Sequence, residues 1–142
     1  MVNRLILSVV LLLSSNAFSQ DIFGKWKTID DKTGEAKSIV KIYKHDGKVF
    51  GKIVAIFDAS KRDLPCIHCE GEDYNKPILG LNIIKNMEKE GDYYRNGTVV
   101  NPEDGKVYRL RLALEEDNLD VLQVRGYFAF FYQTQYWKRV AE

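Results

Sequence analysis

Two cysteines stand three positions apart in Cys66-Ile67-His68-Cys69, and their thiols are the groups in this chain best suited to chemistry. In an oxidising compartment such a pair most often forms a structural disulfide that would tie the surrounding loop, and we favour this interpretation. A redox-active pair uses the same spacing but usually begins a helix, which Pro65 and Gly71 disfavour. A zinc site would also need His68, yet adjacent residues rarely reach one ion and no second Cys-x-x-Cys motif is present. We therefore predict a disulfide, with no bound metal and no cofactor.

Three carboxylates follow the cysteine pair closely: Glu70, Glu72 and Asp73. We interpret this acidic cluster as part of a solvated loop, with a cation site or the rim of a binding site as the sharper alternative. The next segment, Asn75-Lys76-Pro77, supplies an amide, an ammonium group and a rigid bend. Because these groups could either anchor the loop or contact a ligand, Asn75 and Lys76 enter the candidate ligand-binding set.

Aromatic residues are concentrated near the C-terminus: Tyr127, Phe128, Phe130, Phe131, Tyr132, Tyr136 and Trp137. Most of these rings are expected to fill the core or to close the last strands. The segment Phe128-Ala129-Phe130-Phe131 breaks strict alternation, however, so some rings must point outward or into the mouth of a cavity. Such a group of rings could hold an apolar ligand. The candidate ligand-binding set is Tyr108, Phe128, Phe130, Tyr132, Asn75 and Lys76.

Nucleophilic catalysis finds little support in the sequence. After residue 19 the chain has only Ser38 and Ser60 as serines, and only His45 and His68 as histidines. Neither serine lies in the Gly-x-Ser-x-Gly turn that exposes a hydrolase nucleophile. We identify no catalytic residue and expect a protein that is not an enzyme.

Short β-type runs separated by turn residues must position these groups. They cover residues 23–29, 37–44, 48–57, 78–84, 93–100, 106–114, 119–127 and 132–140. Asp46-Gly47 and the segment 101–105 have the composition of hairpin turns, and only residues 86–90 hint at a helix. Regularly spaced runs of this kind predict an all-β fold. We expect an antiparallel up-and-down β-barrel of about eight strands, because closing the sheet removes its exposed edges.

The first 19 residues have the layout of a secretory signal peptide. Arg4 precedes an apolar run over residues 5–13, and small residues lead to an expected cleavage after Ser19. We therefore expect residues 20–142 to form one domain that is periplasmic or secreted and is not inserted in the membrane after cleavage. The formal net charge of the chain is only +1, so nucleic acid and anionic membranes are not expected as partners.

Several motifs of this chain are also found in a known family. They are Gly24-Lys25-Trp26, Gly51-Lys52-Ile53, Cys66-x-x-Cys69, Gly71-Glu72, Asn75-Lys76-Pro77-Ile78-Leu79-Gly80-Leu81, Asn101-Pro102-Glu103-Asp104-Gly105-Lys106, Val124-Arg125-Gly126-Tyr127 and Gln135-x-Trp137-Lys138-Arg139. Through them the chain resembles DUF2147, a family of uncharacterised exported bacterial proteins. The two end motifs also resemble the calycin arrangement of lipocalins, in which a Gly-x-Trp strand packs beneath an arginine where the barrel closes.

The resemblance implies a lipocalin-like barrel and supplies no catalytic residue. We expect the closure to involve Gly24, Trp26 and Arg139, with Gly24 leaving room for the Trp26 ring and Arg139 stacking on it. The leading hypothesis is an exported binding protein for a small apolar or amphipathic ligand. The alternatives are an envelope protein-interaction module that uses the loop 58–77, and a thiol redox or metal-binding protein that uses Cys66 and Cys69.

Overall fold

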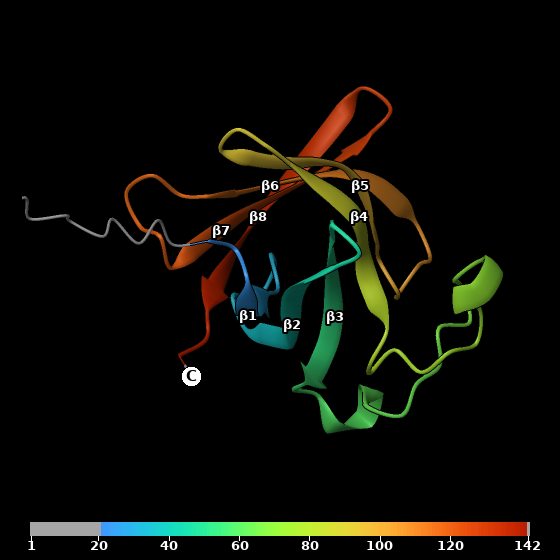
Figure 1. Ribbon diagram of the computed structural model, residues 1–142. Coiled ribbons are helices and arrows are strands. Elements are labelled where there is room, and N and C mark those ends of the chain that lie inside the picture. Colours follow the sequence, from blue (N-terminus) through green and yellow to red (C-terminus); the bar gives the residue numbers. More distant parts are fainter. Residues whose placement is uncertain (1–20, 142) are drawn as a thin grey trace, which may run out of the picture.

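Alternation of apolar and polar residues folds this chain into eight antiparallel strands. The computed structural model describes residues 21–141, and the predicted signal peptide lies outside this range. The strands are β1 (Gly24–Ile29), β2 (Ala36–His45), β3 (Lys48–Ile56), β4 (Asn82–Glu90), β5 (Tyr93–Val100), β6 (Val107–Leu114), β7 (Val121–Phe128) and β8 (Phe131–Arg139). Each strand pairs with the next and β1 also pairs with β8, so the sheet closes into a barrel (Figure 1). The predicted fold class is confirmed.

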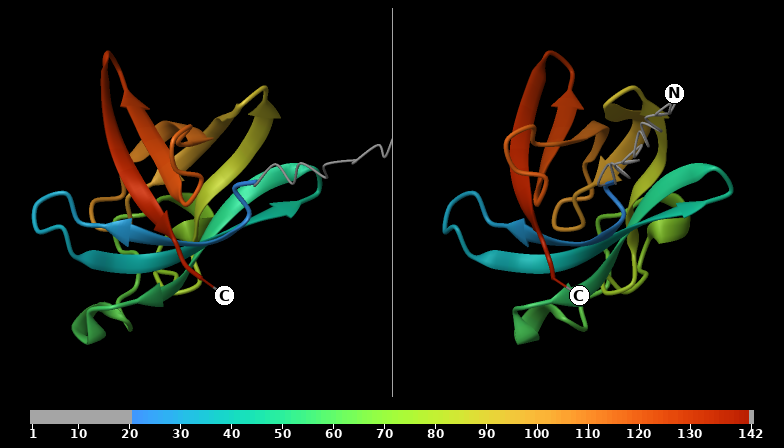
Figure 2. Two further views of the ribbon diagram at one scale, coloured as in Figure 1. Left: turned by 90° about the vertical axis from the view of Figure 1, so that its left-hand side faces the viewer. Right: turned by 60° about the vertical axis from the view of Figure 1, so that its left-hand side comes forward.

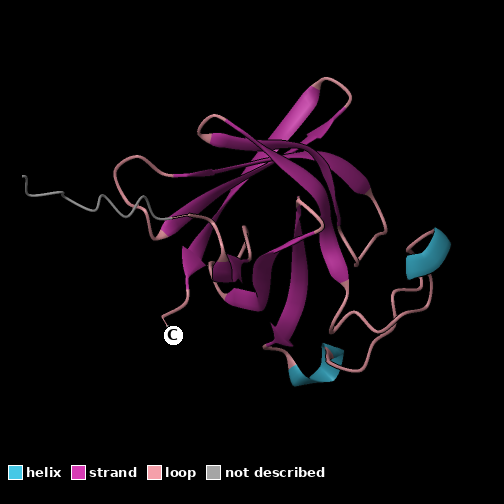
Figure 3. Ribbon diagram, in the orientation of Figure 1, coloured by secondary structure: helices cyan, strands magenta, loops and turns pink. Residues whose placement is uncertain are grey.

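Strands make up nearly all of the regular structure (Figure 3). Two short 3₁₀ helices, η1 (Ala59–Lys61) and η2 (Gly71–Asp73), lie in the loop between β3 and β4. Within residues 21–141 no helix is long and apolar enough to cross a bilayer. The β2–β3 hairpin turns at Asp46 and Gly47, whose φ angles are 49° and 79°. Positive φ at both central positions is what a type I′ turn requires, and the Asp-Gly pair supplies it.

The fourth strand differs from its prediction. The sequence places a strand over residues 78–84 and leaves 86–90 as a helical pattern too short to stand alone. In the structure β4 runs from Asn82 to Glu90, so the predicted strand bounds are wrong and residues 86–90 belong to the strand. Gly80 adopts a φ of 94° in the loop just before the strand. Asn86 adopts a φ of 61° inside the strand, and because of this irregularity the buried side chain that follows Ile84 is Met87 instead of the residue at position 86. A spacing of three between buried residues imitates a helix, although its cause is a local backbone distortion.

The barrel has a closed end and an open end. β1 leads away from the closed end, which holds Trp26, so the loops 30–35, 57–81 and 101–106 and the turn at 129–130 lie at the open end. The closed half is filled by buried apolar side chains from most of the strands: Val40, Ile42, Val49, Ile53, Ile84, Met87, Leu110, Leu112, Leu122 and Val124. Gly51 makes room for Ile84, because a Cβ at Gly51 would lie 2.9 Å from the Ile84 side chain. The packing leaves the open end as the part of the interior that solvent can reach.

The floor of the barrel is covered by one aromatic ring. Trp26 is fully buried, and its indole Nε1 donates to the carbonyl oxygen of Ile22 at 2.8 Å. The Arg139 guanidinium lies 4.3 Å from the centroid of the Trp26 ring and donates to three backbone carbonyl groups beside it. Position 24 requires glycine because of its backbone conformation and not, as expected from the sequence, because the Trp26 ring needs the space. Its φ is 118°, which side chains disfavour, while a Cβ there would meet nothing within 4 Å.

Candidate functional site

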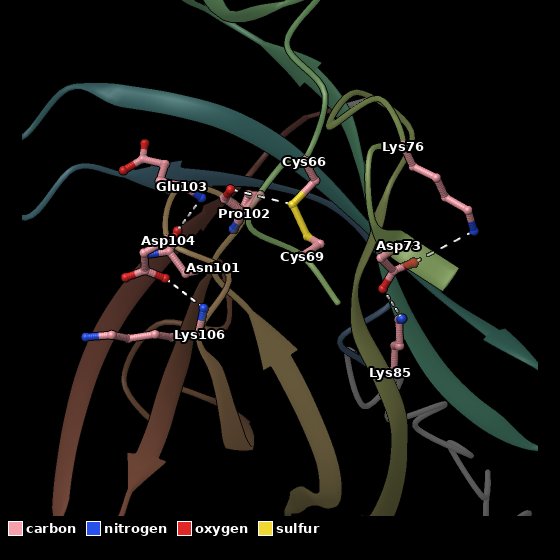
Figure 4. The surroundings of a disulfide bond; sticks show 10 residues. All are labelled: Cys66, Cys69, Asp73, Lys76, Lys85, Asn101, Pro102, Glu103, Asp104 and Lys106. Carbon is pink, nitrogen blue, oxygen red and sulfur yellow. Dashed lines mark hydrogen bonds and ion pairs between the residues drawn. A yellow bond between two sulfur atoms is a disulfide. The ribbon is translucent and has the colours of Figure 1, made fainter. Parts of the chain in front are cut away.

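Cys66 and Cys69 form a disulfide in the loop between β3 and β4, as the sequence predicts (Figure 4). Both residues are buried, with 0% and 4% of their surface exposed. The loop folds back on itself here. The Cys66 N–H donates to the Lys76 carbonyl at 2.7 Å, and the Asn75 N–H donates to the Cys66 carbonyl at 2.9 Å. Because burial keeps the sulfur atoms away from thiols in solvent, the disulfide is a structural tie within the loop.

The disulfide packs against the outer side of the barrel. Ile83 of β4 and Val100 of β5 join the two cysteines in the buried apolar cluster, and both line a small pocket beside Cys69. The loop also presses on the β5–β6 turn, where Gly105 lies against the carbonyl group of His68 so closely that a Cβ would collide with it. The long loop therefore covers part of the barrel wall near the open end.

A pocket of about 390 Å³ lies between this loop and strands β3 and β4. Lys76 lines it together with Phe50 and Leu79, whereas Asn75 is not among its lining residues. Asp73, also in the lining, forms ion pairs with Lys85 and with Lys76, and Figure 4 shows both ammonium groups directed toward it. The acidic cluster is thus partly neutralised by lysines. Among the described residues, no group of three or more His, Cys, Asp or Glu side chains is arranged to hold a metal ion.

The aromatic residues of the predicted ligand-binding set lie in different environments. Tyr108 of β6 and Phe128 of β7 meet edge to face on the inner side at the open end, with ring centroids 5.9 Å apart. Tyr132 lies on the outer side, where the Arg125 guanidinium is 4.6 Å from its ring centroid. Phe130 occupies the β7–β8 turn and is fully exposed. Of the six residues in the set, the structure brings Tyr108 and Phe128 together at the mouth and separates the others from them.

Gly126 determines how the Tyr108 ring lies. A Cβ at Gly126 would be 3.3 Å from the Tyr108 Cβ, closer than an ordinary van der Waals contact. Because Gly126 has no side chain, Tyr108 can lie flat against β7 and reach Phe128. Tyr108 is half-buried in this position, so one side of its ring stays available at the mouth.

A polar cluster that the sequence patterns did not reveal lies beside these rings. The Nε2 atoms of Gln133 and Gln135 both donate to one carboxylate oxygen of Asp31, at 3.0 and 3.2 Å. Gln135 also accepts a hydrogen bond from Trp137 Nε1 at 3.0 Å. The alternation of side chains along β8 could have identified these amides as inward-facing, because every second residue counted back from the buried Trp137 faces inward.

Solvent reaches the inner side of the open end. Phe128 and Phe131 are 55% and 77% exposed although both occupy inward positions, while the inward Leu122, deeper in the barrel, is fully buried. Gln133 is exposed and Gln135 is half-buried. Figure 2 shows why: the β7–β8 hairpin projects beyond the rest of the barrel. The result is an accessible surface with aromatic rings on β6 and β7 and hydrogen-bonding groups on β8, an arrangement that suits an amphipathic molecule.

The described residues do not form a recognisable nucleophile–base pair. Ser38 shares a hydrogen bond of 2.7 Å with Thr28, and Ser60 donates to the Asp58 carboxylate at 2.6 Å. The Ser60 hydroxyl and N–H lower the pKa of Asp58, which favours the ionised form and disfavours a role as general acid. Neither serine is hydrogen-bonded to a histidine within residues 21–141.

Comparison with known proteins agrees with this architecture. Among solved structures the fold is similar to that of protein HP1028 from Helicobacter pylori, which is described as belonging to the lipocalin family. The TM-score is 0.73 at 21% sequence identity, and the alignment covers 86% of this chain and 84% of HP1028. No match is found among curated proteins. The family model for DUF2147, described as an uncharacterised protein conserved in bacteria, matches residues 24–139. The chain therefore belongs to the DUF2147 family and has a lipocalin-like fold.

Proposed function

We propose that this protein is an exported binding protein that holds a small amphipathic molecule at the open end of its barrel and does not catalyse a reaction. The lipocalin-like fold supports a binding role, since barrels of this size can take one small ligand. The observation that carries the proposal is the contrast between the two halves of the interior. The closed half is packed with side chains, whereas inward positions at the open end bear exposed aromatic and amide groups.

The chemistry of the mouth narrows the class of ligand. Tyr108 and Phe128 offer apolar faces to a hydrocarbon or aromatic portion. Asp31 accepts hydrogen bonds from two glutamine amides and is the carboxylate in this hydrogen-bond network of the mouth. A head group that donates hydrogen bonds, such as an amine or alcohol, would therefore be favoured there. A carboxylate head group would be repelled by Asp31.

The test is a binding titration with three probes of equal chain length: dodecylamine, dodecanol and dodecanoate, each kept below the concentration at which it aggregates or separates from water. Tryptophan fluorescence is the signal, because the Trp137 indole is hydrogen-bonded to Gln135 at the site, whereas Trp26 is buried at the closed end. The amine and the alcohol should bind more tightly than dodecanoate. Tyr108→Ser should weaken their binding about tenfold through lost apolar contact, while Tyr74→Ser, at a tyrosine exposed in the outer loop, should leave binding unchanged.

Two results of this titration count against the proposal. One is the absence of saturable binding by any of the three probes. The other is equal affinity in the wild type and the Tyr108→Ser variant, since that would place the bound molecule away from the mouth.

The long loop supports a second candidate, a protein-interaction module. Its exposed apolar side chains are Phe57, Leu64, Ile67, Tyr74 and Leu79. The disulfide and its backbone hydrogen bonds hold this loop in one shape, which lowers the entropy cost of binding a partner. Crosslinking in envelope extracts should then give a defined adduct that Ile67→Asp abolishes and Phe130→Asp retains. Loss of the adduct in both variants, or in neither, would contradict a role for this loop.

A further inference from the structure

Charge is segregated between the strands and the loops of this barrel. The strands contain fifteen lysines and arginines but only two carboxylates, Glu88 and Glu90. Seven of the eight strands, all except β4, contain no aspartate or glutamate. The near-neutral net charge, from which the sequence predicts no polyanionic or membrane partner, therefore conceals a barrel wall with a strong positive excess.

Five lysines on this wall form a continuous group, the lysine wall: Lys25, Lys27, Lys41, Lys52 and Lys138. Each of them is next in sequence to a buried inward residue, so each faces outward. The strand register places them beside one another: Lys138 is opposite Lys27, Lys25 is opposite Lys41, and Lys41 is opposite Lys52. Within residues 21–141 none of the five forms an ion pair.

Like charges directly opposite on neighbouring strands destabilise a sheet. A carboxylate at any neighbouring outward position of these strands would relieve the repulsion, yet none is present. The arrangement is accounted for if an anionic surface supplies the missing negative charge from outside.

Exposed rings extend this wall along β8. Counting outward from the buried Trp137, the outer side of the hairpin carries Tyr136 and Tyr132 and ends at Phe130, which are 51%, 63% and 100% exposed. Figure 2 shows β8 crossing β1 and β2 on one side of the molecule and leading up to the projecting hairpin. We call Phe130, Tyr132 and Tyr136 the aromatic edge. It begins beside Lys138 and continues the same outward face.

We propose that the lysine wall and the aromatic edge together dock the protein peripherally on an anionic lipid bilayer. Lysines bind anionic head groups, and exposed aromatic rings favour the interface between head groups and acyl chains. A soluble polyanion would account for the lysines but not for a fully exposed Phe130. A protein partner would account for the rings but not for five unpaired lysines, since lysine is depleted in protein interfaces.

Vesicle co-sedimentation tests this docking, and it needs no ligand at the mouth. Wild-type protein should bind vesicles of phosphatidylcholine with phosphatidylglycerol, should not bind phosphatidylcholine alone, and should dissociate as salt is raised. Neutralising one lysine should weaken binding about fivefold, so K25Q/K41Q/K52Q should lose on the order of a hundredfold. The matched variant K32Q/K61Q/K106Q removes the same charge from exposed loops and should bind within about twofold of wild type.

Phe130→Ser separates a bilayer from a soluble polyanion. It should weaken binding to the anionic vesicles at least severalfold and leave binding to inorganic polyphosphate unchanged. The variants alter outward-facing side chains, and equal melting temperatures would confirm that they fold. Equal losses in the wall and loop triple variants would overturn the proposal, because net charge alone would then explain binding. Full vesicle binding by Phe130→Ser, with competition by polyphosphate, would overturn it in favour of a soluble polyanion.

Discussion

At the scale of single residues, the closed end depends on the buried Trp26. Its ring is covered on one side by Arg139, and its indole N–H is satisfied by a backbone carbonyl. Replacing Trp26 with alanine removes this burial and leaves a cavity, which should lower the free energy of unfolding by about 3–5 kcal/mol. Urea denaturation measures the loss, and Tyr136→Ala, at an exposed ring, should change stability by less than about 0.5 kcal/mol. Equal urea midpoints for the Trp26 variant and wild type would contradict the burial of this ring.

Tyr94 gives the barrel a specific weakness in alkali. It points into the core with 8% exposure, and burial raises the pKa of its phenol above the usual 10.0. Stability contributed by the neutral phenol is fully present below pH 10 and is lost as the pH rises through the raised pKa, because the phenolate must leave the core. Tyr94→Phe should therefore reduce the alkaline loss of stability, measured by urea midpoints between about pH 9 and pH 11. The exposed control Tyr136→Phe should follow the wild-type curve, and a Tyr94→Phe curve identical to wild type would show that this phenol does not titrate on unfolding.

The candidate site shows which residues a sequence can and cannot reveal. The disulfide between Cys66 and Cys69 was predictable because Pro65 and Gly71 disfavour the helix of a redox-active pair, and because no second Cys-x-x-Cys motif completes a zinc site. Gln133 and Gln135 were missed because glutamine in a strand normally signals a solvent face, and their inward position follows only once Trp137 is known to be buried. Their common partner, Asp31, lies about a hundred residues away in another loop, so only the closure of the barrel brings it there.

At the scale of elements, the disulfide loop and the β5–β6 turn hold each other through Gly105. This glycine has a φ of 75° and touches the carbonyl group of His68. Gly105→Ala should destabilise the protein both by backbone strain and by pushing the loop off the barrel wall. Gly34→Ala is the matched control, because Gly34 has a similar φ of 71° and nothing within 4 Å of a Cβ.

Trypsin digestion distinguishes the two effects of the Gly105 substitution. The loop carries Lys61 and Arg62, so its detachment should speed cleavage at these two sites several-fold in Gly105→Ala but not in Gly34→Ala. Cleavage at the same rate in both glycine variants would show that the contact with His68 does not hold the loop.

The strands themselves were largely predictable, and the one clear failure has a local cause. Seven of the eight runs were placed within about two residues of their observed ends, because period-two alternation reports burial directly. β4 was misplaced because Gly80 and Asn86 both adopt positive φ, and Asn86 interrupts the alternation within the strand. Asparagine tolerates positive φ, but its presence in a sequence does not by itself indicate that conformation. Sequence patterns therefore could not distinguish a bulge from a helical spacing.

At the scale of the whole molecule, the two ends of the barrel and one side of its wall have different roles. The closed half supplies stability through a packed core, the open end supplies an amphipathic mouth, and the wall of β8, β1, β2 and β3 supplies positive charge. Net charge was a poor guide to this division, since carboxylates in loops cancel lysines in strands when the whole chain is summed. Only the register of the strands shows that Lys25, Lys41 and Lys52 stand in one row.

The binding site at the open end is tested most directly by mapping amide chemical shifts of ¹⁵N-labelled protein during a titration with dodecylamine. The largest changes should occur at the mouth: Asp31, Tyr108, Gly126, Phe128, Phe131, Gln133 and Gln135. Little change is expected in the pocket beside the disulfide loop, which is lined by Lys76, Leu79 and Asn82. The largest changes in that pocket, or no change anywhere at saturating probe, would contradict a ligand site at the mouth of the barrel.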